Sequence, residues 1–314
     1  TIEVTPTYTN NGFSCIGNPE TFTITVNPGA QVNPVPNQQI CAGGSTDDIT
    51  FDTSNEDGTT TYTWTIDNTA IGENLDASGS GDIPSFVVTN DTDNALVATI
   101  EVTPTYTNNE VICTGNPETF TITVNPLGQV DPVPSQELCA GDSTDVITFE
   151  TTNDNGITTY TWTNDNPLIG LAASGPEDST ETTIPPFVAT NGTNTPITAN
   201  ISVTSFLTIN GFTCEGNTED FTITVNPSPQ VDFSEDDQFI TSGQSSLEVN
   251  LTSAVENVTM SWTAAADPGI QGLINLSGTN TIPQETLTLG NEIEEPQLVV
   301  YTVLVSGSIS DCEG

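Results

Sequence analysis

Two kinds of side chain in this sequence could do chemistry, carboxylates and thiols. The 314 residues include 42 aspartates and glutamates and six cysteines, but no lysine, arginine or histidine. Such a chain cannot form internal salt bridges, hold a phosphate through Arg or Lys, or use imidazole as a base or metal ligand. Nucleic-acid binding depends on basic groups and is therefore excluded as the main function.

Paired carboxylates are the one catalytic arrangement left, as in glycosidases. The acidic residues fall in loop-like segments, however, and nothing in the sequence indicates a deep pocket. We therefore expect no enzymatic activity, no catalytic residues and no required cofactor. With a net charge of −42, the chain should behave as a polyanion that stays soluble, repels its own copies and gathers cations.

Acidic loops are the candidate cation sites, because calcium takes about six to eight oxygen ligands from carboxylates, amides and carbonyls. None of the loops matches the EF-hand pattern. The alternative is that they are solvated turns, since turns in a lysine-free chain must be built from Asp, Asn, Gly or Ser. Calcium is thus the one candidate cofactor, and its candidate ligands are Asp52, Asp57, Asp91, Asp93 and Asp154.

The elements that carry these residues are predicted to be β-strands. Apolar residues and threonines alternate strictly in segments 21–26, 61–65 and 159–163, which is typical of strands with one buried face. Threonine suits such strands because its branched Cβ favours the extended backbone. No stretch has a helical period, so the sequence predicts an all-β fold.

The sequence repeats with a period near 98 residues, which indicates a tandem array. Residues 1–28 and 99–126 are nearly identical, and a third copy occupies 200–227. From this register we expect residues 1–28 to be the C-terminal hairpin of a preceding truncated repeat. Complete repeats should follow at 29–126 and 127–226, and a repeat truncated before its last strand at 227–314.

Each repeat is predicted to be an immunoglobulin-like β-sandwich. In the first, strands are expected at 31–40, 48–54, 60–67, 83–90, 95–108 and 119–126. The tryptophan of the third strand should pack in the core, at Trp64, Trp162 and Trp262. Short proline-rich linkers between repeats favour an extended rod.

The cysteines fall into two classes with two pairing schemes. Cys41 and Cys139 follow the first strand of their repeats, whereas Cys15, Cys113, Cys214 and Cys312 precede the last strand. Pairing within a repeat would give Cys41–Cys113 and Cys139–Cys214. In an immunoglobulin-like sandwich those positions lie at opposite ends, about 30 Å apart, whereas a disulfide needs Cα atoms within about 7 Å.

Pairing each early cysteine with the late cysteine of the following repeat gives Cys41–Cys214 and Cys139–Cys312. Cys15 and Cys113 would then have partners outside the fragment. We favour this interdomain scheme, with intradomain bonds and free thiols as alternatives.

Several motifs together resemble the PKD-like repeats of giant Bacteroidota cell-surface adhesins, especially flavobacterial gliding-motility adhesins. They are Ile40-Cys41-Ala42-Gly43, Tyr62-Thr63-Trp64, Cys113-Thr114-Gly115-Asn116-Pro117 and Phe120-Thr121-Ile122-Thr123-Val124-Asn125-Pro126. The resemblance covers the whole chain, and the third repeat departs from it at Thr241. It implies type 9 secretion, an extracellular filament anchored at the outer membrane, and partners in the outer-membrane secretion and motility machinery.

The favoured hypothesis is a structural and adhesive stalk segment whose partners are the neighbouring repeats. An extracellular surface or glycan would then be bound through other parts of the protein. The alternative is that the repeats themselves bind glycans or surfaces. Exposed aromatic residues would be typical of that function, yet Tyr62, Trp64, Tyr160 and Trp162 alternate toward the predicted core.

Overall fold

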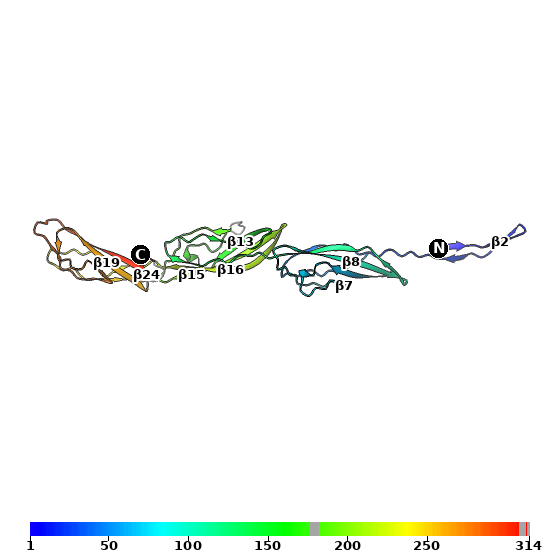
Figure 1. Ribbon diagram of the computed structural model, residues 1–314, viewed down its shortest axis with the longest axis horizontal. Coiled ribbons are helices and arrows are strands. Elements are labelled where there is room, and N and C mark those ends of the chain that lie inside the picture. Colours follow the sequence, from blue (N-terminus) through cyan, green and yellow to red (C-terminus); the bar gives the residue numbers. More distant parts are fainter. Residues whose placement is uncertain (176–181, 308–311, 313–314) are drawn as a thin grey trace. The chain divides into compact units, whose positions relative to one another are not determined.

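The computed structural model describes residues 1–175, 182–307 and 312, and its regular elements are almost all β-strands (Figure 1). The exceptions in the described chain are two one-turn 3₁₀ helices, η1 (Thr69–Ile71) and η2 (Pro167–Ile169). None of the described helices is long and apolar enough to span a membrane. The all-β fold class is therefore confirmed. The chain divides into two units, residues 1–126 and 127–314.

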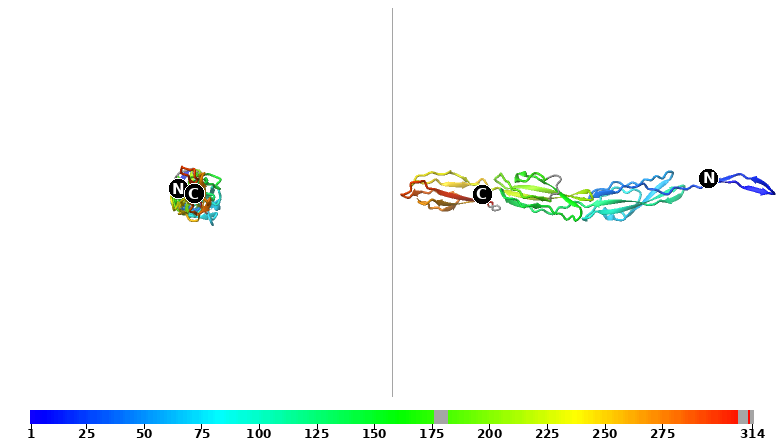
Figure 2. Two further views of the ribbon diagram at one scale, coloured as in Figure 1. Left: turned by 90° about the vertical axis from the view of Figure 1, so that its left-hand side faces the viewer. Right: turned by 90° about the horizontal axis from the view of Figure 1, so that it is seen from above.

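The first unit begins with two small antiparallel pairs of strands. Strand β1 (Ile2–Val4) pairs with β4 (Glu20–Phe22), and β2 (Thr7–Asn10) pairs with β3 (Phe13–Ile16). No second layer of strands covers them (Figure 2), and all four strands are exposed, with Phe13 81% and Phe22 51% accessible.

The rest of the first unit is a β-sandwich built around one main sheet. The strand order is β5-β10-β8-β6-β7, and β9 pairs with the far end of β8. The strands are β5 (Gln38–Cys41), β6 (Thr59–Ile66), β7 (Ser78–Ser80), β8 (Leu96–Asn108), β9 (Val111–Thr114) and β10 (Glu118–Asn125). Pairing between β10 and β5 is parallel, whereas the other pairs are antiparallel.

Alternation along these strands places the apolar side chains in one core. Ile100, Val102 and Ile122 are fully buried, and the polar residues that alternate with them, such as Glu101 and Thr121, face outward. Trp64 is 8% exposed and its Nε1 donates a hydrogen bond to the Gly81 carbonyl at 3.0 Å. The expected alternation of Thr and apolar residues therefore does produce a half-buried sheet.

Residues 127–226 form a second sandwich with the same arrangement. Its main sheet has the order β11-β16-β15-β13, and a two-stranded sheet, β12-β14, lies in the other layer. The strands are β11 (Gln136–Cys139), β12 (Ile147–Thr148), β13 (Ile157–Asn164), β14 (Thr183–Ile184), β15 (Ile197–Ile209) and β16 (Phe212–Asn226). Ile201, Val203 and Ile223 are fully buried, and Trp162 packs against this core while partly exposed.

Residues 227–314 contain a smaller core around Leu251, Met260, Trp262, Ile282 and Val305. The sheets have the orders β17-β18-β22, β21-β19-β24 and β20-β23. The strands are β17 (Asp232–Phe233), β18 (Val249–Thr252), β19 (Val258–Ala266), β20 (Ile270–Gln271), β21 (Ser277–Thr279), β22 (Thr281–Ile282), β23 (Thr288–Leu289) and β24 (Val299–Gly307). Strand β24 is an edge strand among the described residues.

Three expected strands of the first repeat are shorter than the sequence pattern predicts. Residues 31–40 pair only from Gln38 onward, because prolines 34 and 36 lack the N–H that a ladder requires. Segments 48–54 and 83–90 pair only through isolated bridges such as Ile49 with Ile83. Elsewhere in these segments, aspartate carboxylates are the hydrogen-bond acceptors in place of backbone carbonyls of a neighbouring strand. Asp82 accepts the Phe51 N–H, and Asp48 accepts the Ser85 N–H.

Candidate functional site

The candidate site is the connection between residues 127–226 and 227–314, and its first component is Cys139. This residue ends β11, which runs parallel to the last part of β16, with Cys139 opposite Asn226. Parallel strands end at the same edge of a sheet, so Cys139 lies where the chain leaves the second repeat. The Ala140 N–H donates to the Asn226 carbonyl at 2.8 Å and fixes the turn after β11.

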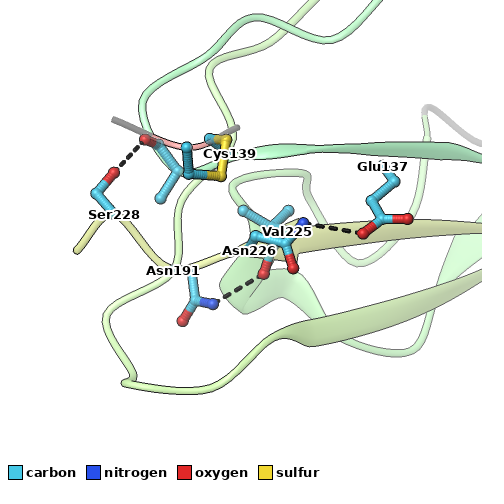
Figure 3. The surroundings of a disulfide bond; sticks show 8 residues. Glu137, Cys139, Asn191, Val225, Asn226 and Ser228 are labelled. Carbon is cyan, nitrogen blue, oxygen red and sulfur yellow. Dashed lines mark hydrogen bonds between the residues drawn. A yellow bond between two sulfur atoms is a disulfide. The ribbon is translucent and has the colours of Figure 1, made fainter. Parts of the chain in front are cut away.

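The second component is Cys312, which follows β24 in the third repeat. Its carbonyl accepts the Gly307 N–H at 2.8 Å, and the residue is only 2% exposed. Cys139 and Cys312 form a disulfide with a Cα–Cα distance of 5.5 Å (Figure 3). The two repeats are therefore joined covalently twice, by the backbone after Asn226 and by this disulfide.

Polar contacts surround the disulfide. Ser228, just inside the third repeat, donates through Oγ to the Ala140 carbonyl at 2.7 Å. The Asn226 side chain is buried and its amide donates to Glu137 at 3.0 Å (Figure 3). These hydrogen bonds hold both sides of the connection between the two repeats.

The Asn191 side chain, which the sequence analysis does not single out, supports the end of β16. The Asn191 amide donates to the carbonyls of Val225 and Thr195, at 2.8 and 2.9 Å (Figure 3). Asn90 makes the same pair of bonds in the first repeat, to Val124 and Asn94. The spacing of 101 residues between Asn90 and Asn191 is the signal that could have identified this structural role.

The remaining cysteines decide between the two pairing schemes. Cys15 is an exposed free thiol and Cys113 a partly exposed one. The intradomain scheme is therefore wrong, because Cys113 is not bonded to Cys41 and Cys139 is bonded to Cys312 rather than Cys214. Cys41 and Cys214 are also disulfide-bonded, and their pairing with each other stays a prediction.

The candidate calcium ligands are not brought together. Asp52, Asp57, Asp91 and Asp154 are exposed, and Asp93 is partly exposed. Within the ranges that the structure describes, no three Asp, Glu, Cys or His side chains form a group suited to a metal ion. The expectation of calcium sites in these loops therefore receives no support from the geometry.

Several carboxylates instead accept backbone N–H groups at equivalent places in the three repeats. Asp67 accepts from Thr99, Asp165 from Asn200 and Asp267 from Leu298, at 2.7, 2.7 and 2.9 Å. Asp165 also accepts from the Asn200 side-chain amide at 2.7 Å. The hydrogen bonds from Asn200 lower the pKa of Asp165 below its ordinary value because they favour the charged form.

The cavities of the described chain are small or open. One of about 110 Å³ lies at the repeat connection and is lined in part by Pro227, Glu256 and Cys312. Another of about 440 Å³ lies beside Tyr160, with Asp131 and Glu150 among its lining residues. Burial raises the pKa of the Tyr160 hydroxyl, which favours its neutral form.

Comparison with known proteins identifies the repeat type. The profile of the PKD-like domain matches residues 38–128 and 239–314, together more than half of the chain. A search of the curated proteins found none that matches.

Solved structures that resemble the chain are themselves tandem arrays. One is Drosophila N-cadherin EC1–4, with 14% identity, 99% of this chain and 80% of that chain covered, and a TM-score of 0.35. Another is mouse cadherin-23 EC22–24, with 13% identity, 89% and 93% coverage, and a TM-score of 0.38.

Proposed function

The chain belongs to the PKD-like domain family, and we propose that it is a non-enzymatic repeat segment of a large secreted adhesin. In this proposal it acts as an extended acidic stalk that holds an adhesive part away from the cell, on the outer surface. The resemblance to gliding-motility adhesins extends the proposal to surface attachment during gliding, after type 9 secretion and with anchoring at the outer membrane.

The observation that carries the proposal is the disulfide between Cys139 and Cys312, which joins two successive repeats. A force that pulls the chain ends apart would pass through this bond rather than through the residues between the two cysteines. Cys139 and Cys312 are 173 positions apart in the sequence, and the residues between them would be shielded from the load. A covalent connection between repeats suits a stalk under tension.

Charge supports the same proposal. With 42 acidic residues and no basic ones, neighbouring filaments would repel one another and stay separate. Internal stability cannot rest on ion pairs between side chains, and backbone N–H groups donate hydrogen bonds to several of the carboxylates instead. Of the four aromatic side chains considered for a glycan-binding surface, Trp64 and Tyr160 are buried, and Tyr62 and Trp162 are partly buried.

Single-molecule force spectroscopy on the whole chain, pulled from its ends, tests the mechanical role. Because an extended residue spans about 3.5 Å, reduction should lengthen the fully unfolded chain by at least about 600 Å relative to the oxidised chain. The Cys15→Ser/Cys113→Ser variant removes only the two free thiols and should leave the oxidised length unchanged. Equal lengths for the oxidised and reduced chains would contradict the proposal.

The adhesive alternative is tested separately, with the same chain on a glycan array. We expect no binding above that of an unrelated acidic protein. Specific retention on a class of glycan would show that the repeats themselves are the binding modules and would displace the stalk as the main function.

A further inference from the structure

An asparagine side chain holds the first residues of the second repeat to a loop of the same repeat. Asn153 Oδ1 accepts the Gln129 N–H at 2.8 Å, and the Asn153 amide donates to the Leu127 carbonyl at 3.3 Å. Thr151 Oγ1 donates to Asn153 Oδ1 at 3.1 Å and thereby holds the asparagine side chain in place. We call the two bonds from Asn153 to residues 127 and 129 the asparagine clamp.

The first repeat contains the same clamp. Asn55 Oδ1 accepts the Gln31 N–H at 2.8 Å, and the Asn55 amide donates to the Gly29 carbonyl at 3.1 Å. Thr53 Oγ1 donates to Asn55 Oδ1 at 3.0 Å, as Thr151 does to Asn153 in the second repeat. Two repeats therefore fix their first residues through the same bonds at equivalent positions.

Close backbone packing holds the same segments from a second direction. A Cβ built on Gly216 in β16 would lie 2.0 Å from the Gly128 carbonyl oxygen, and one built on Gly115 would lie 2.0 Å from the Ala30 carbonyl oxygen. No side chain fits at such a distance, so each segment lies directly against the last hairpin of its own repeat. The residues that lead into the first and second repeats therefore belong to the repeat that they enter.

The third repeat has a valine in place of the clamping asparagine. The Val255 N–H donates to Ser253 Oγ at 3.2 Å, as the Asn153 N–H donates to Thr151 Oγ1 at 3.1 Å. These matching bonds identify Val255 and Asn153 as equivalent positions. Valine has neither a donor nor an acceptor in its side chain, so neither bond of the clamp can form there.

The segment that leads into the third repeat is bonded to the repeat that it leaves. Ser228 corresponds to Leu127, because each follows the same Val-Asn-Pro sequence. Ser228 Oγ donates to the Ala140 carbonyl of the second repeat at 2.7 Å, a bond for which Leu127 has no hydroxyl. Loss of the clamp and gain of this hydroxyl thus occur together, at the same connection.

We propose that the clamp position, asparagine or valine, decides where the chain bends between successive repeats. With Asn153 in place, residues 127–129 move with the second repeat that they enter, and the pivot lies before them. With Val255 in place, Ser228 moves with the second repeat that it leaves, and the pivot lies after it, at the exposed Gln230. This device goes beyond the stalk proposal, and its test does not depend on force or adhesion.

Reciprocal substitutions in the full chain test the proposal, with NMR-detected hydrogen exchange of single backbone amides as the measurement. Asn153→Val should speed exchange of the Gln129 N–H at least about tenfold, because this N–H loses its acceptor. The variant is compatible with the fold, since valine occupies the equivalent position in the third repeat. Val255→Asn should supply an acceptor and slow exchange of the Gln230 N–H at least about tenfold.

Two further variants of the second repeat are matched controls. Asn153→Asp keeps the acceptor for the Gln129 N–H and loses only the donor to Leu127, so exchange at Gln129 should stay near the parent rate. Thr152→Ala removes the bond from Thr152 Oγ1 to Gln129 Oε1 at 2.5 Å and leaves the clamp intact. Exchange of the Gln129 N–H should therefore also stay near the parent rate in this variant.

NMR order parameters locate the pivot directly. In the parent chain the Gln129 amide should have the value of a rigid backbone, about 0.85, and the Gln230 amide a value below about 0.6. Val255→Asn should raise the value at Gln230 toward that of Gln129. An unchanged exchange rate at Gln129 in Asn153→Val, or unchanged exchange and order at Gln230 in Val255→Asn, would overturn the proposal.

Discussion

At the scale of single residues, the carboxylates of this chain must be stabilised without cationic side chains. Glu285 is the most buried example, with 3% of its surface exposed. Its carboxylate accepts the Asn275 N–H at 2.8 Å and the Asn275 side-chain amide at 2.7 Å. Phe86 and Phe187 occupy the position of Glu285 in the first and second repeats. The carbonyls of Phe86, Phe187 and Glu285 accept the backbone N–H groups of the equivalent residues Thr46, Thr144 and Ser246. The third repeat thus fills an apolar position with a hydrogen-bonded acid.

Replacing this acid should destabilise the third repeat. Glu285→Ala removes the buried carboxylate that accepts both Asn275 donors, so the free energy of unfolding of residues 227–314 should fall by about 1–3 kcal/mol. Amide hydrogen exchange of that repeat is the measurement. Glu292→Ala, at an exposed glutamate, is the control and should change stability by less than about 0.5 kcal/mol. Equal effects of the two substitutions would contradict the role assigned to Glu285.

The bonds from Asn200 to Asp165 predict a specific pH dependence. The pKa of Asp165 is lowered in the folded chain, so its contribution is present above the unfolded pKa and is lost as the pH falls through the folded pKa. Carbon NMR of the Asp165 carboxyl should give a titration midpoint below the ordinary aspartate value. In the Asn200→Ala variant the midpoint should move upward. An unchanged midpoint in that variant would refute the assigned cause.

At the scale of elements, Gly79 in β7 leaves room for the ring of Trp64 on the neighbouring strand β6. A Cβ built on Gly79 would lie 2.3 Å from the Trp64 ring, and Gly175 and Gly278 have similar close approaches to Trp162 and Trp262. Gly79→Ala should therefore lower the free energy of unfolding of the first repeat by about 1–3 kcal/mol through overpacking. Chemical denaturation followed by tryptophan fluorescence measures this effect.

Gly29→Ala is the matched control for that substitution, because a Cβ at Gly29 would have no atom within 4 Å. It should leave the unfolding midpoint close to that of the parent chain. A Gly79→Ala variant as stable as the Gly29→Ala variant would show that the contact with Trp64 is not restrictive.

Sequence reasoning predicts the central strands well and the second layer poorly. Strands 60–67, 95–108 and 119–126 are observed within one or two residues, because an uninterrupted period of two specifies a half-buried strand. In segments 48–54 and 83–90, the carboxylates of Asp48 and Asp82 accept backbone N–H groups in place of the expected backbone carbonyls. Alternation alone does not reveal which acceptor an N–H group will find.

At the scale of the whole molecule, uncompensated charge should govern stability. Because the net charge is −42, folding brings carboxylates together without ion pairs, and salt should relieve the repulsion. We expect the melting temperature, measured by circular dichroism, to rise steadily when NaCl increases from about 10 mM to about 500 mM. A melting temperature that falls over this range would contradict a stability limited by repulsion.

The connection between repeats was predictable only in part. The period of the cysteines and the 7 Å reach of a disulfide favour pairs such as Cys139–Cys312 over pairs within a repeat. The supporting residues Asn191 and Ser228 carry no such signal, because asparagine and serine are common in every loop of this sequence. Their roles depend on which carbonyls the fold places beside them.

Disulfide mapping under non-reducing conditions tests most directly the claim that successive repeats are joined covalently. Trypsin has no site in this chain, so proteases that cut beside acidic residues are needed. The account predicts two cross-linked peptides, one with Cys139 and Cys312 and one with Cys41 and Cys214. A peptide that links Cys41 to Cys113, or Cys139 to Cys214, would contradict it.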